Sequence, residues 1–98
     1  MNADTLSISV VIPLFNEANR LDNTFNELTF FLNSQKNKKI EIIFIDDGSI
    51  DNSLRKLKLF KKSINSSNHK IIINSYIANK GKGYACKTGV LIANNDLI

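Results

Sequence analysis

Two neighbouring carboxylates, Asp46 and Asp47, follow directly on a run of β-branched and aromatic residues at 40–45, interrupted only by Glu41, and precede Gly48 and Ser49. An apolar run of this length, bounded by turn residues, is typical of a buried strand in a parallel sheet. Adjacent acids repel each other and are costly to desolvate, so a core has little use for them. At the carboxyl end of such a strand, a carboxylate can accept a nucleobase N–H or bind ribose hydroxyls. We therefore predict that this pair reads a ligand; the alternative is an Asx turn that caps a helix.

Polar residues also follow the two other strands that the sequence predicts. Asn16 and Glu17 come after the first strand, and Asn79 and Lys80 come after the third. Because the carboxyl ends of parallel strands meet at one edge of a sheet, we expect these side chains to border one crevice. Glu17 fits a ligand contact and the acidic first turn of a helix equally well. Phe15 is equally consistent with a surface that stacks on a base and with a core residue.

A loop of glycine and lysine at residues 79–83 offers main-chain N–H groups and two ammonium groups ahead of a helix, which suits a phosphate. Residues 81–88 come within one residue of both the dinucleotide fingerprint and the P-loop motif G-x-x-x-x-G-K-T. Cys86 stands where each motif requires a glycine. A P-loop-like phosphate binder therefore remains an alternative.

The order of elements predicts an α/β fold. Residues 7–13, 40–45 and 70–76 are rich in β-branched side chains and predict strands. Apolar side chains at helical spacing predict two helices between these strands, at Leu21, Phe25, Leu28 and Leu32 and again at Leu54, Leu57, Phe60 and Ile64. We expect Ser49 or Asp51 to cap the second helix. A third helix is predicted at about residues 84–94, and a fourth strand starts at 95–98. This alternation favours a parallel, doubly wound sheet.

The composition narrows the class of protein. The 98 residues allow one small domain, and the single cysteine excludes an internal disulfide and suggests a reducing compartment. The sequence shows neither a signal peptide nor an apolar run of membrane-spanning length, so we expect a cytoplasmic location. The net charge of +4 favours anionic partners in general. The lysine-rich second helix is interpreted as a solvated face, and no nucleic acid partner is expected.

Three motifs in order carry a resemblance to a known family. Residues 10–17 (VVIPLFNE), 45–51 (IDDGSID) and 79–85 (NKGKGYA) resemble the family 2 glycosyltransferases, inverting enzymes with the GT-A fold and nucleotide-sugar donors. The third motif looks most like the branch that uses polyprenyl phosphate, the dolichyl-phosphate glucosyl- and mannosyltransferases. The resemblance implies a Rossmann-like (GT-A) parallel sheet with helices on both faces, present here as an incomplete β-α-β-α-β-α-(β) fragment.

The resemblance also implies roles for particular residues. The residues implied to bind the nucleotide sugar are Pro13, Phe15, Glu17, Asp47, Asn79 and Lys80. Asp47 would accept the N–H of the base, and Asp46 would support the loop. Phe15 stands where the family often has tyrosine, which would retain stacking without a hydroxyl contact. The motifs present include neither catalytic residues nor metal ligands.

The function implied is transfer of a hexose from a UDP- or GDP-sugar to an acceptor, either polyprenyl phosphate or a glycan. The family's Asp-x-Asp motif, which holds Mg²⁺ or Mn²⁺, and its catalytic base would lie beyond residue 98, and Asp96 is not interpreted as a ligand. We therefore expect residues 1–98 to be the N-terminal nucleotide-sugar-binding part, truncated before that motif and inactive alone. Missing regions would allow association with the cytoplasmic face of a membrane. A nucleotide-binding module without chemistry is the other alternative.

Overall fold

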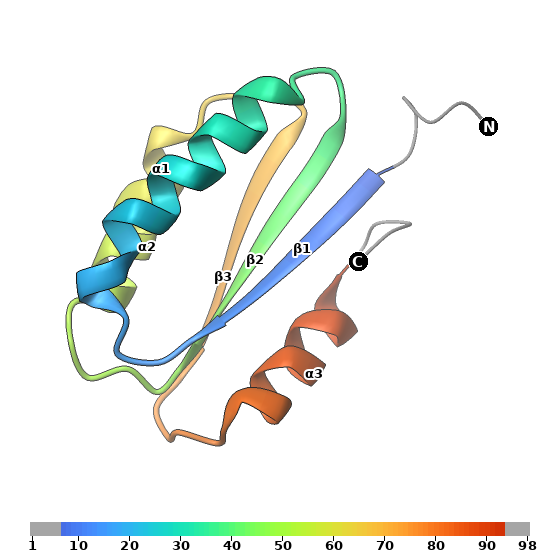
Figure 1. The fold of residues 1–98 in the computed structure, drawn as a ribbon. Helices are drawn as coiled ribbons and strands as arrows, with labels where there is room; N and C mark the ends of the chain where they lie inside the picture. Colours follow the sequence, from blue (N-terminus) through green and yellow to red (C-terminus); the bar gives the residue numbers. More distant parts are fainter. Residues whose placement is uncertain (1–6, 94–98) are drawn as a thin grey trace.

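The computed structural model describes residues 7–93 (Figure 1). In order, its elements are β1 (Ser7–Leu14), α1 (Ala18–Ser34), β2 (Lys39–Asp47), α2 (Ser53–Ser63), β3 (His69–Tyr76) and α3 (Lys82–Ile92). The predicted alternation of strands and helices is confirmed over this range. The start of a fourth strand at 95–98, together with Asp96, lies outside the described residues. Within residues 7–93, none of the helices combines the length and apolar character that crossing a bilayer requires.

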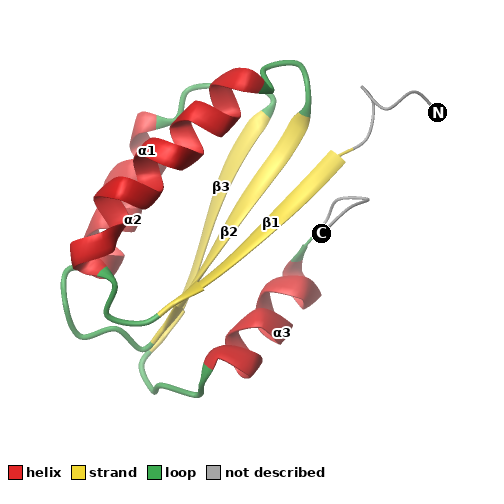
Figure 2. Cartoon of the chain, viewed as in Figure 1, coloured by secondary structure: helices red, strands yellow, loops and turns green. Residues whose placement is uncertain are grey.

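The three described strands form one parallel sheet in the order β1-β2-β3 (Figure 2). β2 lies in the centre, and Ile42, Ile43, Phe44 and Ile45 are completely buried. A central parallel strand has neighbours on both edges and helices over both faces, so it has no polar face to present to water. This explains why residues 42–45 are continuously apolar rather than alternating; Glu41, the charged residue before them, is buried and accepts a hydrogen bond from the Ser9 hydroxyl at 2.6 Å.

Helices cover both faces of the sheet, as predicted for a Rossmann-like fold. α1 and α2 lie on one face and α3 lies on the other (Figure 1). Side chains alternate along β2, so Ile42 and Phe44 pack with α1 and α2 while Ile43 and Ile45 pack toward α3. Phe44 contacts Phe25 and Phe60 edge to face, and those two rings stack with centroids 4.4 Å apart.

The position of α3 shows that the chain reverses its direction across the sheet. α3 follows β3 but packs on β1 and β2. Since crossovers between parallel strands are right-handed, helices on opposite faces mean that the chain has turned back toward β1. Ligand sites of open α/β sheets lie where the winding reverses, outside the carboxyl ends of the strands. The first turn of α3 lies at that edge.

One local prediction was wrong, and a second was correct for one of its two candidate residues. Residues 82 and 83 were expected in a loop, but α3 begins at Lys82, because Gly81 adopts φ 92° and turns the chain into the helix there. α2 begins at Ser53, and of the two residues expected to cap it, Asp51 accepts the main-chain N–H of Ser53 at 2.9 Å through its Oδ1, whereas Ser49 does not. The Ser49 hydroxyl instead accepts a hydrogen bond from the main-chain N–H of Asn16 at 2.8 Å.

A close contact between α3 and β1 yields the first testable prediction. Gly89 is buried against Val11, and a Cβ built at position 89 would overlap Val11 Cγ1. We expect Gly89→Ala to lower the free energy of unfolding by about 1–3 kcal/mol, the usual range for overpacking. Urea denaturation measures this. Combining it with Val11→Ala should cost less than the sum of the two single variants, because the overlapping methyl groups are gone. Additive losses would contradict this packing.

Candidate functional site

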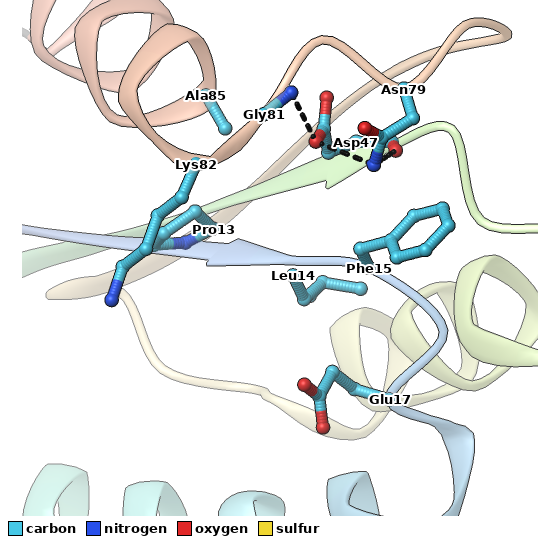
Figure 3. Close-up of a pocket in the computed structure, with 9 residues that line it drawn as sticks. All are labelled: Pro13, Leu14, Phe15, Glu17, Asp47, Asn79, Gly81, Lys82 and Ala85. Atoms are coloured by element: carbon cyan, nitrogen blue, oxygen red, sulfur yellow. Dashed lines mark hydrogen bonds between the residues drawn. The ribbon is translucent and has the colours of Figure 1, made fainter.

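A pocket of about 400 Å³ lies at the carboxyl edge of the sheet, between the ends of β1 and β2 and the start of α3 (Figure 3). Its lining comes from the β1–α1 loop, the end of β2, the β3–α3 loop and the first turns of α3. The lining residues are Pro13, Leu14, Phe15, Glu17, Asp47, Asn79, Gly81, Lys82 and Ala85. The volume falls within the range of sites that hold a small organic ligand.

Asp47 binds the β3–α3 loop through both oxygens of its carboxylate. Oδ1 accepts the N–H of Lys80 at 2.8 Å, and Oδ2 accepts the N–H of Gly81 and the Nδ2 of Asn79, each at 2.9 Å. A carboxylate offers about four acceptor positions, so three are used. Asp47 is only 3% exposed. It therefore forms part of the pocket wall and holds the opposite loop in place.

The environment of Asp47 favours its ionised form. Burial alone would raise its pKa, but the nearby Tyr76 hydroxyl and the N–H groups of Lys80 and Gly81 outweigh burial and hold the pKa below its ordinary value. Burial and the Asp47 charge raise the pKa of Tyr76 above its ordinary value. The Tyr76 hydroxyl is buried, and no partner within residues 7–93 meets the distance and angle of a hydrogen bond with it. The two groups are therefore a carboxylate and a neutral phenol.

Gly48 allows the β3–α3 loop to come this close. Its φ is 76°, and the main chain of residues 77–79 passes directly over its Cα. A side chain here would collide with that main chain. Gly48 and Asp47 together fix the loop on the end of β2.

The β1–α1 loop forms the other wall and is held by the β2–α2 loop. Four hydrogen bonds join them: Asn16 N to Ser49 Oγ, Ile50 N to Asn16 Oδ1, Glu17 N to Ser53 Oγ, and Ala18 N to Asp51 Oδ2, at 2.8–3.2 Å. Asp46 Oδ1 accepts the N–H of Ser49, which confirms that Asp46 supports the loop. The segment after β2 is thus the common anchor of both walls.

Five of the six predicted site residues lie around the pocket, namely Pro13, Phe15, Glu17, Asp47 and Asn79. Phe15 is 43% exposed, so it is not a core residue. Glu17 lines the pocket and also occupies the capping position of α1, with its carboxylate 3.6 Å from Arg20 Nε. Lys80 does not line the pocket. Its ammonium group lies 5.0 Å from the centre of the Tyr84 ring, and its main-chain N–H binds Asp47.

Four lining residues were not among the six predicted site residues, namely Leu14, Gly81, Lys82 and Ala85, although Gly81 and Lys82 belong to the 79–83 loop that was expected to suit a phosphate. A signal for Lys82 was present in the sequence. Ala85 and Gly89 are small residues at helical spacing, a pattern that favours close packing on a sheet, and Lys82 precedes Ala85 by three residues on the same face. Because the helix was expected to start at about residue 84, Lys82 was not placed on this helix face.

The described residues do not fit a metal site or a P-loop. Within residues 7–93, no group of three or more His, Cys, Asp or Glu side chains could hold a metal ion. The carboxylates of Asp46 and Asp47 already accept N–H groups of neighbouring loops. Residues 82–92 form a helix, so residues 81–88 lack the open phosphate loop that the P-loop motif requires.

The fold and the pocket define an α/β protein whose ligand pocket lies at the carboxyl edge of a parallel sheet. The model of the family described as "Glycosyl transferase family 2" matches residues 9–98. The chain therefore belongs to glycosyl transferase family 2, which confirms the resemblance inferred from the three motifs.

Curated relatives support the same membership. The chain is similar to a dolichyl-phosphate beta-glucosyltransferase of Dictyostelium discoideum, with 35% identity over 90% of this chain and 28% of that protein. The Saccharomyces cerevisiae protein of the same name is 33% identical over 90% of this chain and 27% of its own length. An uncharacterized glycosyltransferase of Synechocystis is 33% identical over 96% and 28%. The chain thus spans less than a third of the length of these relatives.

Proposed function

We propose that this chain is the nucleotide-sugar-binding part of an inverting glycosyltransferase that transfers a hexose from a UDP- or GDP-sugar to polyprenyl phosphate. The names of the two dolichyl-phosphate relatives support this acceptor, and the family supports the donor class. The observation that carries the proposal is one pocket bordered by the β1–α1 loop, the end of β2 and the β3–α3 loop. In the whole protein, the reaction would take place at the cytoplasmic face of a membrane.

In this proposal the base of the donor lies at the end of the pocket lined by Phe15 and Asn79, which are both on the right in Figure 3. Phe15 offers an exposed aromatic face for stacking. Asp47 has about one acceptor position left for an N–H of the base, because three are used by the loop. Glu17 and Pro13 complete the binding surface. Lys80 contributes through its main chain.

The Mg²⁺ or Mn²⁺ ion and the catalytic base that the family implies would be supplied from outside residues 7–93. The contribution of the described residues is to bind and orient the donor. We expect the 98-residue chain mixed with donor sugar, polyprenyl phosphate and Mn²⁺ to transfer no sugar.

Replacing Phe15 tests the nucleotide pocket. Base stacking on an aromatic ring is worth about 1–3 kcal/mol, so we expect Phe15→Ala to weaken the binding of UDP or GDP about tenfold. Isothermal titration calorimetry of the 98-residue chain with UDP, GDP and ATP measures this. Phe30→Ala is the matched control, because Phe30 is an exposed phenylalanine on α1 that does not line the pocket. It should bind as the wild type does.

Two results would count against the proposal. Wild-type chain that binds neither UDP nor GDP would remove the nucleotide pocket altogether. Binding of ATP alone, with equal affinity in wild type and Phe15→Ala, would favour a phosphate binder of another class.

A further inference from the structure

Two lysines near the pocket lie in different environments. Lys80 directs its ammonium group over the ring of Tyr84, at 5.0 Å from the ring centre, and this ring contacts Tyr76 edge to face. Lys80 is thus engaged with the aromatic pair on the outer side of the loop. Lys82 lines the pocket itself. Only one residue, Gly81, separates these cations in sequence, so the local pattern alone could not distinguish them.

The geometry of α3 explains why Lys82 reaches the pocket. Ala85 is completely buried against the sheet, and Gly89 packs on Val11 one turn later. Lys82 lies on the same helix face, one turn before Ala85, where the strands of the sheet have ended. Its side chain extends past Pro13, at the opposite end of the pocket from Phe15 (Figure 3).

The positive charge of Lys82 is not paired with an acid in the described part of the chain. The ion pairs found there join Arg20 with Glu17 and Lys56 with Asp22. The other acid of the pocket, Asp47, accepts its hydrogen bonds from the 79–81 loop. An exposed ammonium group that lines a pocket and forms no ion pair attracts an anionic part of a ligand.

The first turn of α3 strengthens this preference for an anion. Within the described residues, this 11-residue helix has no acidic residue in its first turn and no side chain that caps its first N–H groups. The helix dipole therefore adds partial positive charge next to Lys82. The pocket thus has an aromatic end at Phe15 and a cationic end at Lys82.

We propose that Lys82, and not Lys80, contacts the diphosphate of the donor and makes the pocket prefer nucleoside diphosphates to nucleosides. This inference rests on the proposed nucleotide pocket and names the group that binds the phosphates. Lys82 is a binding and specificity residue here; it takes no part in proton transfer.

The test compares ligands with and without phosphate. Calorimetry measures the affinities of uridine and UDP, and of guanosine and GDP, for wild type, Lys82→Gln and Lys80→Gln. A hydrogen bond to a charged group is worth about 1.5–3 kcal/mol, so Lys82→Gln should weaken the diphosphate at least about tenfold. The nucleoside should bind Lys82→Gln as it binds wild type. Lys80→Gln is the matched control, and its preference for the diphosphate should stay within about twofold of wild type.

Two further measurements sharpen the result. Lys82→Arg should keep most of the preference for the diphosphate, since it keeps the charge. The affinity of wild type for the diphosphate should fall with added salt more steeply than that of Lys82→Gln. A preference for the diphosphate that is equal in wild type and Lys82→Gln, or lost in Lys80→Gln instead, would overturn this assignment and leave the pocket intact. Failure of wild type to bind any of the four ligands would overturn both the pocket and the assignment.

Discussion

Gly48→Ala is expected to destabilise the chain by at least about 3 kcal/mol, a large share of the 5–15 kcal/mol typical of a small domain. The new Cβ would lie 2.7 Å from Asn79 N, 2.8 Å from Ile77 O and 2.9 Å from Ala78 C. All three atoms belong to the main chain, so no side-chain rotation can relieve the overlap. The φ of 76° adds strain for any residue with a Cβ. Urea denaturation followed by circular dichroism measures the loss.

Two other glycines provide matched controls for this variant. Gly81 also has a positive φ, 92°, but no described heavy atom lies within 4 Å of a Cβ built on it, so Gly81→Ala should cost only the backbone strain of about 1–2 kcal/mol. Gly83 has neither strain nor a near neighbour among the described residues. Gly83→Ala should stabilise the chain by about 0.4–1 kcal/mol. Equal losses for Gly48→Ala and Gly81→Ala would show that the loop does not pass over Gly48.

Asp47→Asn is expected to destabilise the chain at neutral pH and to weaken binding of nucleosides and nucleoside diphosphates alike. The amide keeps one acceptor oxygen, and its NH₂ group faces donors that can no longer bond to it. The N–H groups of Lys80 or Gly81 then lose their partner. Because the loop carries one wall of the pocket, its displacement affects every ligand that enters. Calorimetry and urea denaturation measure the two effects.

The loss in Asp47→Asn should depend on pH in a defined direction. The pKa of Asp47 is lower in the folded chain than the ordinary value of 3.8 that applies on unfolding. The ionised carboxylate therefore stabilises the fold fully above pH 3.8, and this contribution is lost as the pH falls through 3.8 toward the folded pKa. The difference in stability between wild type and Asp47→Asn should shrink over that interval.

Asn79→Ala is a milder variant with which the stability of Asp47→Asn can be compared. It removes only the Nδ2 donor and leaves the two main-chain N–H groups on the carboxylate. We expect a smaller loss of stability, with most of the wild-type pH dependence retained. A stability difference between wild type and Asp47→Asn that is the same at pH 3 and pH 7 would contradict a role for the ionised carboxylate.

The architecture was largely predictable because its signals are local. The apolar run at 42–45 requires burial on both faces, and the helical spacing from Leu21 to Leu32 requires one buried face, so each segment identifies its own element. Parallel connection through helices then follows from the alternation. The convergence of the three loops was also predictable, since it is a property of parallel sheets and needs no side-chain detail.

The roles of the individual site residues were not predictable, because they depend on contacts between residues more than 30 positions apart. Asp47 was expected to read the base, but nothing near it in sequence indicates that the 79–81 loop takes three of its acceptor positions. Ser49 has the local pattern of a helix cap, yet its hydroxyl accepts a hydrogen bond from the main-chain N–H of Asn16. Lys80 and Lys82 are equivalent by composition, and only the start of α3 separates them.

The anchoring of both pocket walls to the segment after β2 has a consequence for the energetics of binding. The β1–α1 loop and the β3–α3 loop are each held by several hydrogen bonds within the chain itself. Ordering a mobile side chain or loop on association normally costs about 0.5–1.5 kcal/mol for each immobilised side chain. In this chain that entropy is lost during folding rather than during binding. The pocket is preorganised, so more of the contact energy of a ligand is available as affinity.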